Sequence, residues 1–383
     1  MLTPEQQELR DTFRRFAERE IAPHAAEADE RAEYPWKSFE AYRNSGFVRL
    51  GYPEEFGGEG ADTVTYALLV EEMARVCASS ALFVIISRLA MTPVLQFGSA
   101  ELKQRFVPRV ASGELQASYC LSEPDAGSDV ANMSARAVRD GDRYVLRGTK
   151  AWITNAGISD LYVVFAKTDP DQGHRGMSAF VVERDTPGFT IGEPEVKMGI
   201  RGSPTCEISL DEVVVPAENR IGAEGQGFAC AMGALDSSRP IIGVQALGIA
   251  QGALDAATQY VQQRRQFGQR IADFQGIQFM LADMATQVEA ARLLLYEACE
   301  LLDAGDPRVS KTASMAKLFA SETAMRVTTD AVQLFGGAGY TRRFPVERMM
   351  RDAKITQIYE GTSQIQRVVI ARRLLDESGR QSS

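Results

Sequence analysis

One carboxylate, in the segment QIYEGTSQIQR (357–367), has the surroundings of a general base. Glu360 follows the apolar and aromatic residues Ile358 and Tyr359 and precedes Gly361. An apolar environment raises the pKa of a carboxyl group toward neutrality, and a glycine lets a ligand approach the backbone closely. A surface loop would also account for this pattern, so the interpretation depends on whether the rest of the chain supplies a substrate site.

A shaped polar loop is predicted within YCLSEPDAGSD (119–129). Pro124 and Gly127 impose a defined turn, and the hydroxyls of Ser122 and Ser128 with nearby N–H groups could bind an anion or a ring system. A simple hairpin loop is the alternative.

An aromatic side chain and a hydroxyl are paired within KAWITNAG (150–157). Trp152 and Thr154 are two residues apart in an extended segment, so they face the same side and could hold a flat heterocycle. A tryptophan in the core is the alternative.

Arginines stand out at two places between residues 226 and 383. Asp236 and Arg239 are three residues apart and lie on one helical face, which a simple ion pair would also explain. Arg264 and Arg265 precede Phe267, and their guanidinium groups could clamp a pyrophosphate or belong to a solvated turn.

Composition excludes several classes of protein. The 383 residues carry a net charge of −9, which argues against a nucleic-acid partner or an anionic membrane surface. The most apolar run, 81–87, is too short to span a bilayer. Five cysteines without a CxxC pair and two histidines predict no metal site and a reduced, cytoplasmic protein.

Changes in hydrophobic periodicity and composition along the chain predict three domains. Residues 1–115 show helical periodicity, beginning with a capping box of Thr3 and Gln6. Residues 116–225 contain short Val-, Ile- and Phe-rich segments and an Asp140-Gly141 hairpin signal, which indicate a compact β-domain. Residues 226–383 are Ala-rich with broad apolar faces, as in helical bundles.

Six stretches together resemble one family, the acyl-CoA dehydrogenases. The sequences YCLSEPDAGSD, KAWITN, LDSSRP, RRQFG, QLFGG and IYEGTSQIQR occur in the order and at the spacing of that family. The resemblance implies an α+β fold that is mainly α: an N-terminal helical domain, a middle β-barrel-like domain and a C-terminal four-helix bundle. It also implies FAD as cofactor, although the dinucleotide fingerprint GxGxxG is absent after any predicted strand.

The resemblance assigns site residues by position. Those matching FAD contacts are Tyr119, Cys120, Leu121, Ser122, Ser128, Trp152, Ile153, Thr154, Arg264, Gln275, Gln333, Leu334, Phe335, Gly336, Gly337, Thr362 and Gln364. Of these, Arg264, Gln275 and 333–337 would serve a neighbouring subunit of a homotetramer. Those matching substrate contacts are Ser128, Asp236, Arg239, Tyr359 and Gly361.

The resemblance also gives Glu360 a reaction. It would remove the α-proton of an acyl-CoA while a hydride leaves the β-carbon for flavin N5, which yields a trans-2-enoyl-CoA. The oxidant of the flavin would be an electron-transferring flavoprotein. One branch of the family carries its base at the position of Ser238, which cannot serve. Bulky Phe83, Ile85 and Ile86 favour short to medium acyl chains, straight or branched. The alternatives are another flavin reaction on this fold and a catalytically silent relative.

Overall fold

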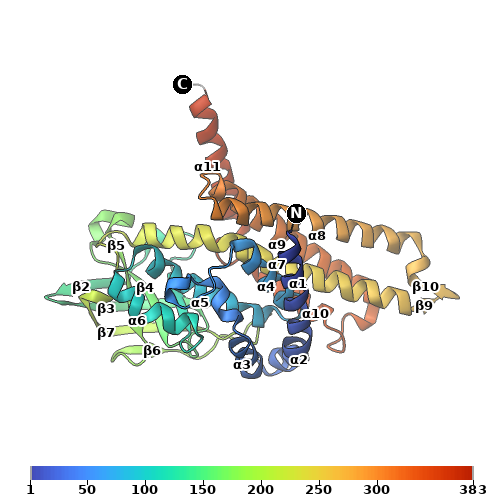
Figure 1. Cartoon of the computed structure of the whole chain (residues 1–383), viewed down its shortest axis with the longest axis horizontal. Coiled ribbons are helices and arrows are strands. Elements are labelled where there is room, and N and C mark those ends of the chain that lie inside the picture. Colours follow the sequence, from blue (N-terminus) through green and yellow to red (C-terminus); the bar gives the residue numbers. More distant parts are fainter. Residues whose placement is uncertain (1, 382–383) are drawn as a thin grey trace.

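The first part of the chain is a layer of helices, shown in blue to cyan in Figure 1. The computed structural model describes residues 2–381, and the side chains of 2–376. The helices are α1 (Pro4–Phe16), α2 (Ala22–Arg31), α3 (Trp36–Asn44), α4 (Thr63–Val76), α5 (Ala78–Phe97) and α6 (Ala100–Ala111). The predicted capping box begins α1: Thr3 Oγ1 accepts from Gln6 N at 3.1 Å, and Gln6 Oε1 accepts from Thr3 N at 3.0 Å.

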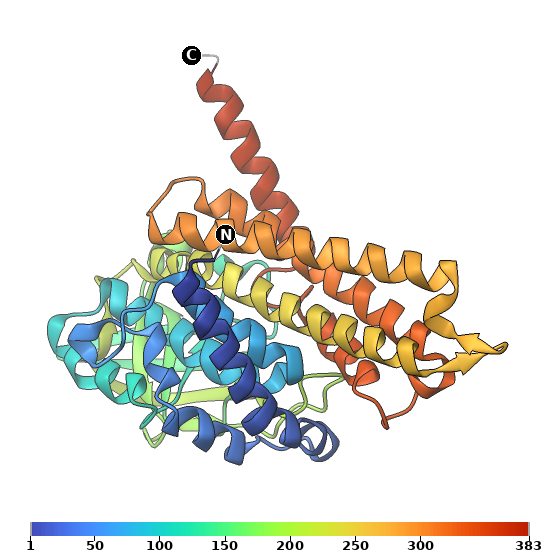
Figure 2. The same ribbon diagram turned by 45° about the vertical axis from the view of Figure 1, so that its right-hand side comes forward.

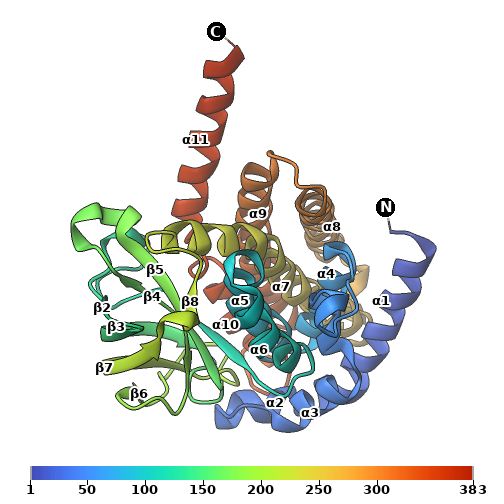
Figure 3. The same ribbon diagram turned by 60° about the vertical axis from the view of Figure 1, so that its left-hand side comes forward.

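An eight-stranded sheet follows, at the left of Figures 1 and 3. The strands are β1 (Ala117–Cys120), β2 (Arg136–Asp140), β3 (Arg143–Thr154), β4 (Leu161–Lys167), β5 (Met177–Glu183), β6 (Phe189–Ile191), β7 (Thr205–Pro216) and β8 (Arg220–Ile221). Their order is β6-β7-β3-β2-β4-β5-β8, with β1 parallel to β4. The Asp140-Gly141 signal is confirmed, because it joins β2 to its antiparallel neighbour β3.

Long helices form the last part of the chain and cross the molecule in Figure 2. They are α7 (Gly227–Gln263), α8 (Gln275–Asp303), α9 (Val309–Phe335), α10 (Val346–Ile355) and α11 (Ser363–Gln381). A small hairpin of β9 (Arg265–Gln266) and β10 (Gln269–Arg270) lies at the end of α7. The predicted order of a helical, a β and a helical region is thus confirmed.

Two glycines let α7 lie directly against α4. A Cβ placed on Gly248 would be 2.5 Å from the carbonyl oxygen of Glu71, and one on Gly252 would be 2.0 Å from that of Arg75. Real Cβ atoms do not approach this closely, so any side chain at these positions would force the two helices apart. The packing matters for function because α7 carries part of the candidate site.

We expect Gly252→Ala to destabilise the protein by about 1–3 kcal/mol, the usual cost of overpacking a core. Urea denaturation would measure the change. Gly276→Ala is the matched control, because Gly276 also lies in a helix but has no atom within 4 Å of an added Cβ. The control should be neutral or slightly stabilising, since alanine favours helix. Equal stability of the two variants would contradict the packing argument.

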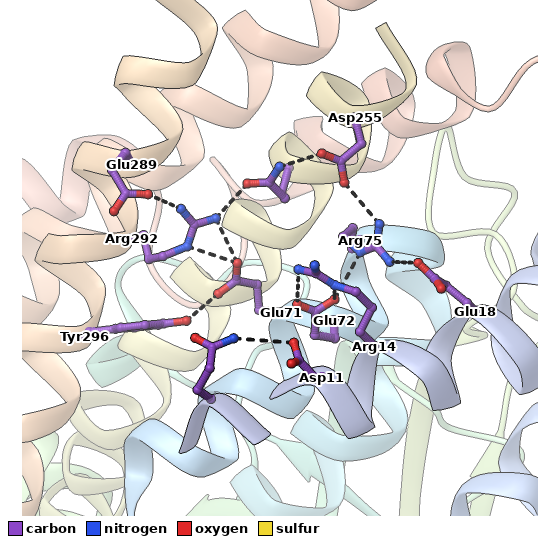
Figure 4. Close-up of polar contacts among 12 residues, drawn as sticks. Asp11, Arg14, Glu18, Glu71, Glu72, Arg75, Asp255, Glu289, Arg292 and Tyr296 are labelled. Atoms are coloured by element: carbon purple, nitrogen blue, oxygen red, sulfur yellow. Dashed lines mark hydrogen bonds and ion pairs between the residues drawn. The ribbon is translucent and has the colours of Figure 1, made fainter. Parts of the chain in front are cut away.

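Buried ion pairs join the N-terminal helices to the bundle (Figure 4). Glu72 is fully buried on α4 and accepts from Arg14 of α1 at 2.8 Å and from Arg75 at 3.0 Å. The adjacent Glu71 accepts from Arg292 of α8 at 3.0 Å and from Tyr296 at 2.6 Å. Each buried carboxylate is therefore paired and hydrogen-bonded, as burial of a charge requires.

Two helices are long and apolar enough to cross a membrane by length and composition alone, namely α5 and α7. The apolar windows of these helices are 83% and 78% buried inside the protein, which is typical of core helices. The sequence argument that the apolar run was too short is therefore wrong for α5, whose 20 residues would suffice. The burial of α5 inside the protein, and not its length, indicates that it is a core helix.

Candidate active site

Glu360 lies in the turn between α10 and α11, where the backbone is left-handed at two successive residues. The φ angles are 51° at Glu360 and 93° at Gly361. A side chain in this conformation is uncommon and often marks a functional site. The half-buried Tyr359 beside it donates its hydroxyl to Gln245 of α7, which ties the turn to the bundle.

The carboxylate of Glu360 is held against α7. Ser238 Oγ donates to Glu360 Oε2. Ser238 cannot itself act as a base, but its hydroxyl orients the carboxylate of Glu360. Burial raises the pKa of Glu360, while the hydrogen bond from Ser238 and the positive charges of Lys317 and Arg239 oppose the rise. A carboxylate with a raised pKa is suited to proton transfer near neutral pH.

The ion pair predicted between Asp236 and Arg239 is present on α7. Arg239 is 6% exposed, and its Nε has no hydrogen-bond partner within the described residues. A buried guanidinium donor left open beside Glu360 is suited to a polar ligand. Ser128, another of the predicted substrate contacts, lies exposed in the loop after β1.

The loop that follows β1 approaches α7 from the sheet side. Tyr119 donates its hydroxyl to the carbonyl of Ala231 at 3.3 Å. Cys120 and Leu121 are buried, whereas Ser122 is half-buried. The carbonyl of Ser122 accepts from Ala151 N at 3.0 Å, so this loop and the end of β3 are hydrogen-bonded together.

The end of β3 presents Trp152 outward. Its side chain is 62% exposed and its φ is 62°, at an irregularity in the pairing with β7. Ile153 is buried and Thr154 is half-buried, so the predicted alternation is observed. The alternative of a core tryptophan is excluded by this exposure. An exposed indole in a left-handed conformation is a candidate platform for a flat ring.

A buried ion pair supports both segments and was not foreseen. Lys150 Nζ on β3 donates to Glu123 Oε1 at 2.8 Å, and both side chains are almost fully buried. Glu123 also accepts from the N–H of Ser134 at 2.6 Å and of Ala135 at 3.0 Å. It therefore determines the course of the loop between β1 and β2.

The predicted contacts Arg264 and Gln275 lie far from Glu360 in the same chain. Arg264 directly follows α7, whose residues from Ser238 to Gln263 span about 37 Å at the helical rise. Gln275 is the first residue of α8, which follows the β9–β10 hairpin. That hairpin lies at the far right of Figure 1. The segment 333–337 ends α9, and the side chains of Leu334 and Phe335 are buried, so only their backbone could contact a ligand.

Phe83 belongs to the N-terminal core. Its ring lies 5.0 Å from that of Tyr34, 5.5 Å from that of Phe39 and 6.4 Å from that of Tyr42. Its size is therefore explained by this aromatic cluster. The inference from Phe83 to a short acyl pocket loses its basis.

Several side chains thus gather around Glu360, between the sheet and the bundle. They are Ser238 and Arg239 of α7, the buried Lys317 of α9 and Tyr119 of β1. Such an arrangement is suited to the transfer of a proton beside a bound ligand. Family models of the N-terminal, middle and C-terminal domains of acyl-CoA dehydrogenases match residues 3–114, 118–213 and 225–375. The chain belongs to the acyl-CoA dehydrogenase family and is an oxidoreductase of that family.

Individual relatives agree along the whole chain. The probable acyl-CoA dehydrogenase FadE25 of Mycobacterium tuberculosis is 54% identical over 98% of this chain and 96% of its own. Butyryl-CoA dehydrogenase of Megasphaera elsdenii has a TM-score of 0.95 and 43% identity, covering 98% and 99% of the two chains. A chain from a structure described for the electron-transferring flavoprotein of Acidaminococcus fermentans has a TM-score of 0.96 and 46% identity, covering 98% and 99% of the two chains.

The residues present fit the FAD on which this family depends. Ser363 Oγ, in the first turn of α11, is buried without a hydrogen-bond partner in the described part of the chain. Thr362 and Gln364 flank it, and the N-terminus of a helix favours phosphate groups. Trp152, Ser122 and Thr154 supply an exposed aromatic face and half-buried polar groups for a ring.

Proposed function

We propose that the protein oxidises a short- to medium-chain acyl-CoA to the trans-2-enoyl-CoA, with Glu360 as the base that removes the α-proton. The observation that carries the proposal is the carboxylate of Glu360, held by Ser238 and given a raised pKa by burial. Its ionised form accepts the α-proton. FAD would accept the hydride from the β-carbon and so supply the redox chemistry.

The turn itself would bind the thioester. Gly361 has no side chain that would block the approach of a thioester to the backbone. The N–H of Glu360 has no hydrogen-bond acceptor among the residues that the structure describes. It is therefore available to the thioester oxygen, whose negative charge grows as the α-proton leaves.

The other site residues would position cofactor and substrate. Trp152, Ile153, Thr154 and the segment from Tyr119 to Ser122 would contact the flavin ring, and Thr362 and Gln364 the adenylate half. Asp236, Arg239, Ser128 and Tyr359 would contact the CoA ester. The likeness to butyryl-CoA dehydrogenase supports a short acyl chain.

An anaerobic titration with saturated acyl-CoAs of graded length and branching tests the proposal. We expect the visible absorbance of the flavin to bleach with some of them, most readily with short to medium chains. The free acid of the same length is the matched control and should not bleach the flavin. A flavin that stays oxidised with every acyl-CoA would refute the proposal and favour another flavin reaction on this fold.

A homotetramer would complete the FAD sites. Arg264 and Gln275 lie far from Glu360 in their own chain, which supports their serving a neighbouring subunit, together with 333–337. Apolar side chains also remain exposed on α8 and on the projecting α11, namely Phe279, Leu293, Leu374 and Leu375. Light scattering during dilution would measure dissociation of the oligomer, and we expect FAD to be lost over the same range of dilution. A monomer that keeps its FAD would contradict this arrangement.

The electron acceptor and the compartment are further parts of the proposal. The similarity to a chain from a structure described for an electron-transferring flavoprotein supports such a protein as the oxidant. We propose a cytoplasmic location, which is supported by the five cysteines, all of them free and buried.

A further inference from the structure

Two buried side chains from different helices hold the Glu360–Gly361 turn by its carbonyl groups. Lys317 Nζ, on α9, donates to the carbonyl of Gly361 at 2.8 Å. Gln366 Nε2, on α11, donates to the same carbonyl at 3.0 Å and to that of Glu360 at 3.3 Å. Both side chains have 0% exposure, so these contacts are made away from solvent.

The turn needs such support because its conformation is unfavourable. The left-handed region is unfavourable for a residue with a side chain, and Glu360 has a φ of 51°. Such a conformation persists only where the surrounding structure imposes it. A Cβ on Gly361 would lie 2.5 Å from Gln366 Nε2, so the turn is packed closely against this glutamine.

Lys317 also brings a positive charge to the base. It forms no ion pair within the described residues, whereas Arg239 is paired with Asp236. Burial lowers the pKa of Lys317 to about 8, and the charge of Glu360 opposes the fall. The other groups facing Glu360 are Ser238 of α7, Tyr66 of α4, Tyr119 of β1 and its neighbour Tyr359.

We propose that Lys317 and Gln366 are positioning residues for the base, because both hold the Glu360–Gly361 turn through its carbonyl groups. Of these two residues, only Lys317 also stabilises the ionised carboxylate of Glu360. The proposal rests on the proposed function of Glu360. It assigns Lys317 two separable effects, one through its hydrogen bond and one through its charge. Gln366 has only the first.

Replacing each residue with methionine separates the two effects. Lys317→Met removes a donor and a charge, and Gln366→Met removes only donors, with similar side-chain length. In both variants, we expect acyl-CoA to bleach the flavin about tenfold more slowly at high pH, because a poorly positioned base loses part of its contribution to the rate. The acid limb of the rate–pH profile should move to higher pH in Lys317→Met alone, since loss of a nearby positive charge disfavours the carboxylate.

A spectroscopic readout is independent of turnover. The carboxyl band of Glu360 can be isolated as the infrared difference between each protein and its Glu360→Gln counterpart, and followed with pH. We expect its titration to move to higher pH in Lys317→Met and to stay in place in Gln366→Met. If Lys317→Met folds poorly, Lys317→Gln keeps a donor without the charge and should show the same movement.

Arg326→Met is the control for net charge, because it removes one positive charge from an exposed position on the same helix. It should leave both the rate and the profile unchanged. A Lys317→Met profile that matches the wild type, or a Gln366→Met profile that moves equally, would overturn the proposal. Failure of the wild type to bleach with any acyl-CoA would instead refute the proposed function, so the two failures are distinguishable.

Discussion

Glu360→Gln is expected to lower the rate of flavin bleaching by acyl-CoA about 10²–10⁴-fold, the usual contribution of a positioned base. Glutamine keeps the size of glutamate and can accept the hydrogen bond from Ser238, but it cannot take up a proton. The protein should therefore fold, bind FAD and remain yellow. Stopped-flow absorbance at saturating acyl-CoA would measure the rate, and the flavin spectrum would measure cofactor content.

The control for this substitution is Glu40→Gln, at an exposed position on α3, which should retain full activity. A Glu360→Gln variant with most of its turnover would remove Glu360 from the catalytic role. In the wild type, the base works only when ionised. Because burial raises its pKa, the rate should rise with pH through that raised value and then level off.

Lys150→Met is expected to destabilise the protein by about 3–5 kcal/mol, because it leaves the carboxylate of Glu123 buried without its cationic partner. Burial opposes ionisation of Glu123, yet Lys150 and the hydrogen bonds from Ser134 hold the pKa of that carboxyl below its usual range. Urea denaturation would measure the loss. The variant should also lose FAD, because Glu123 holds the loop between β1 and β2, and this loop contains predicted flavin contacts.

A double variant identifies the cause. Glu123→Gln combined with Lys150→Met removes the uncompensated charge but keeps an acceptor for the N–H groups of Ser134 and Ala135. The double variant should therefore be more stable than Lys150→Met alone. Lys37→Met, at an exposed position on α3, should change stability by less than about 0.5 kcal/mol. A double variant less stable than the single one would show that lost packing, and not the buried charge, dominates.

Local sequence signals predicted the elements well, because their causes are local. The capping box at Thr3 and Gln6 involves neighbouring residues, and the hairpin at Asp140-Gly141 depends on one glycine with a φ of 66°. The family and the fold class are confirmed as well, since the motifs recur in their order along the chain. The domain boundaries at 115 and 225 and the roles of individual site residues remain predictions.

Other features depend on contacts between distant segments. Ser238 and Glu360 are 122 residues apart, and no local pattern shows that one donates to the other. The same holds for Lys317: a lysine within an Ala-rich helix is usually solvated, and only the packing of α9 under the turn makes it a buried donor. The one available signal was a lone lysine among the small alanine, serine and threonine side chains of that helix face.

The order of residues was thus sufficient for the family and for the sequence of helical and β regions, because these depend on composition, spacing and short-range backbone preferences. It also singled out Glu360, whose role as the base stays a prediction. The tertiary structure decided how the base is held, which charges surround it, and which predicted contacts lie too far away to serve the same subunit. The physical reason is that burial, pKa and pairing arise from side chains brought together across the fold, and their energies depend on that environment rather than on neighbours in the chain.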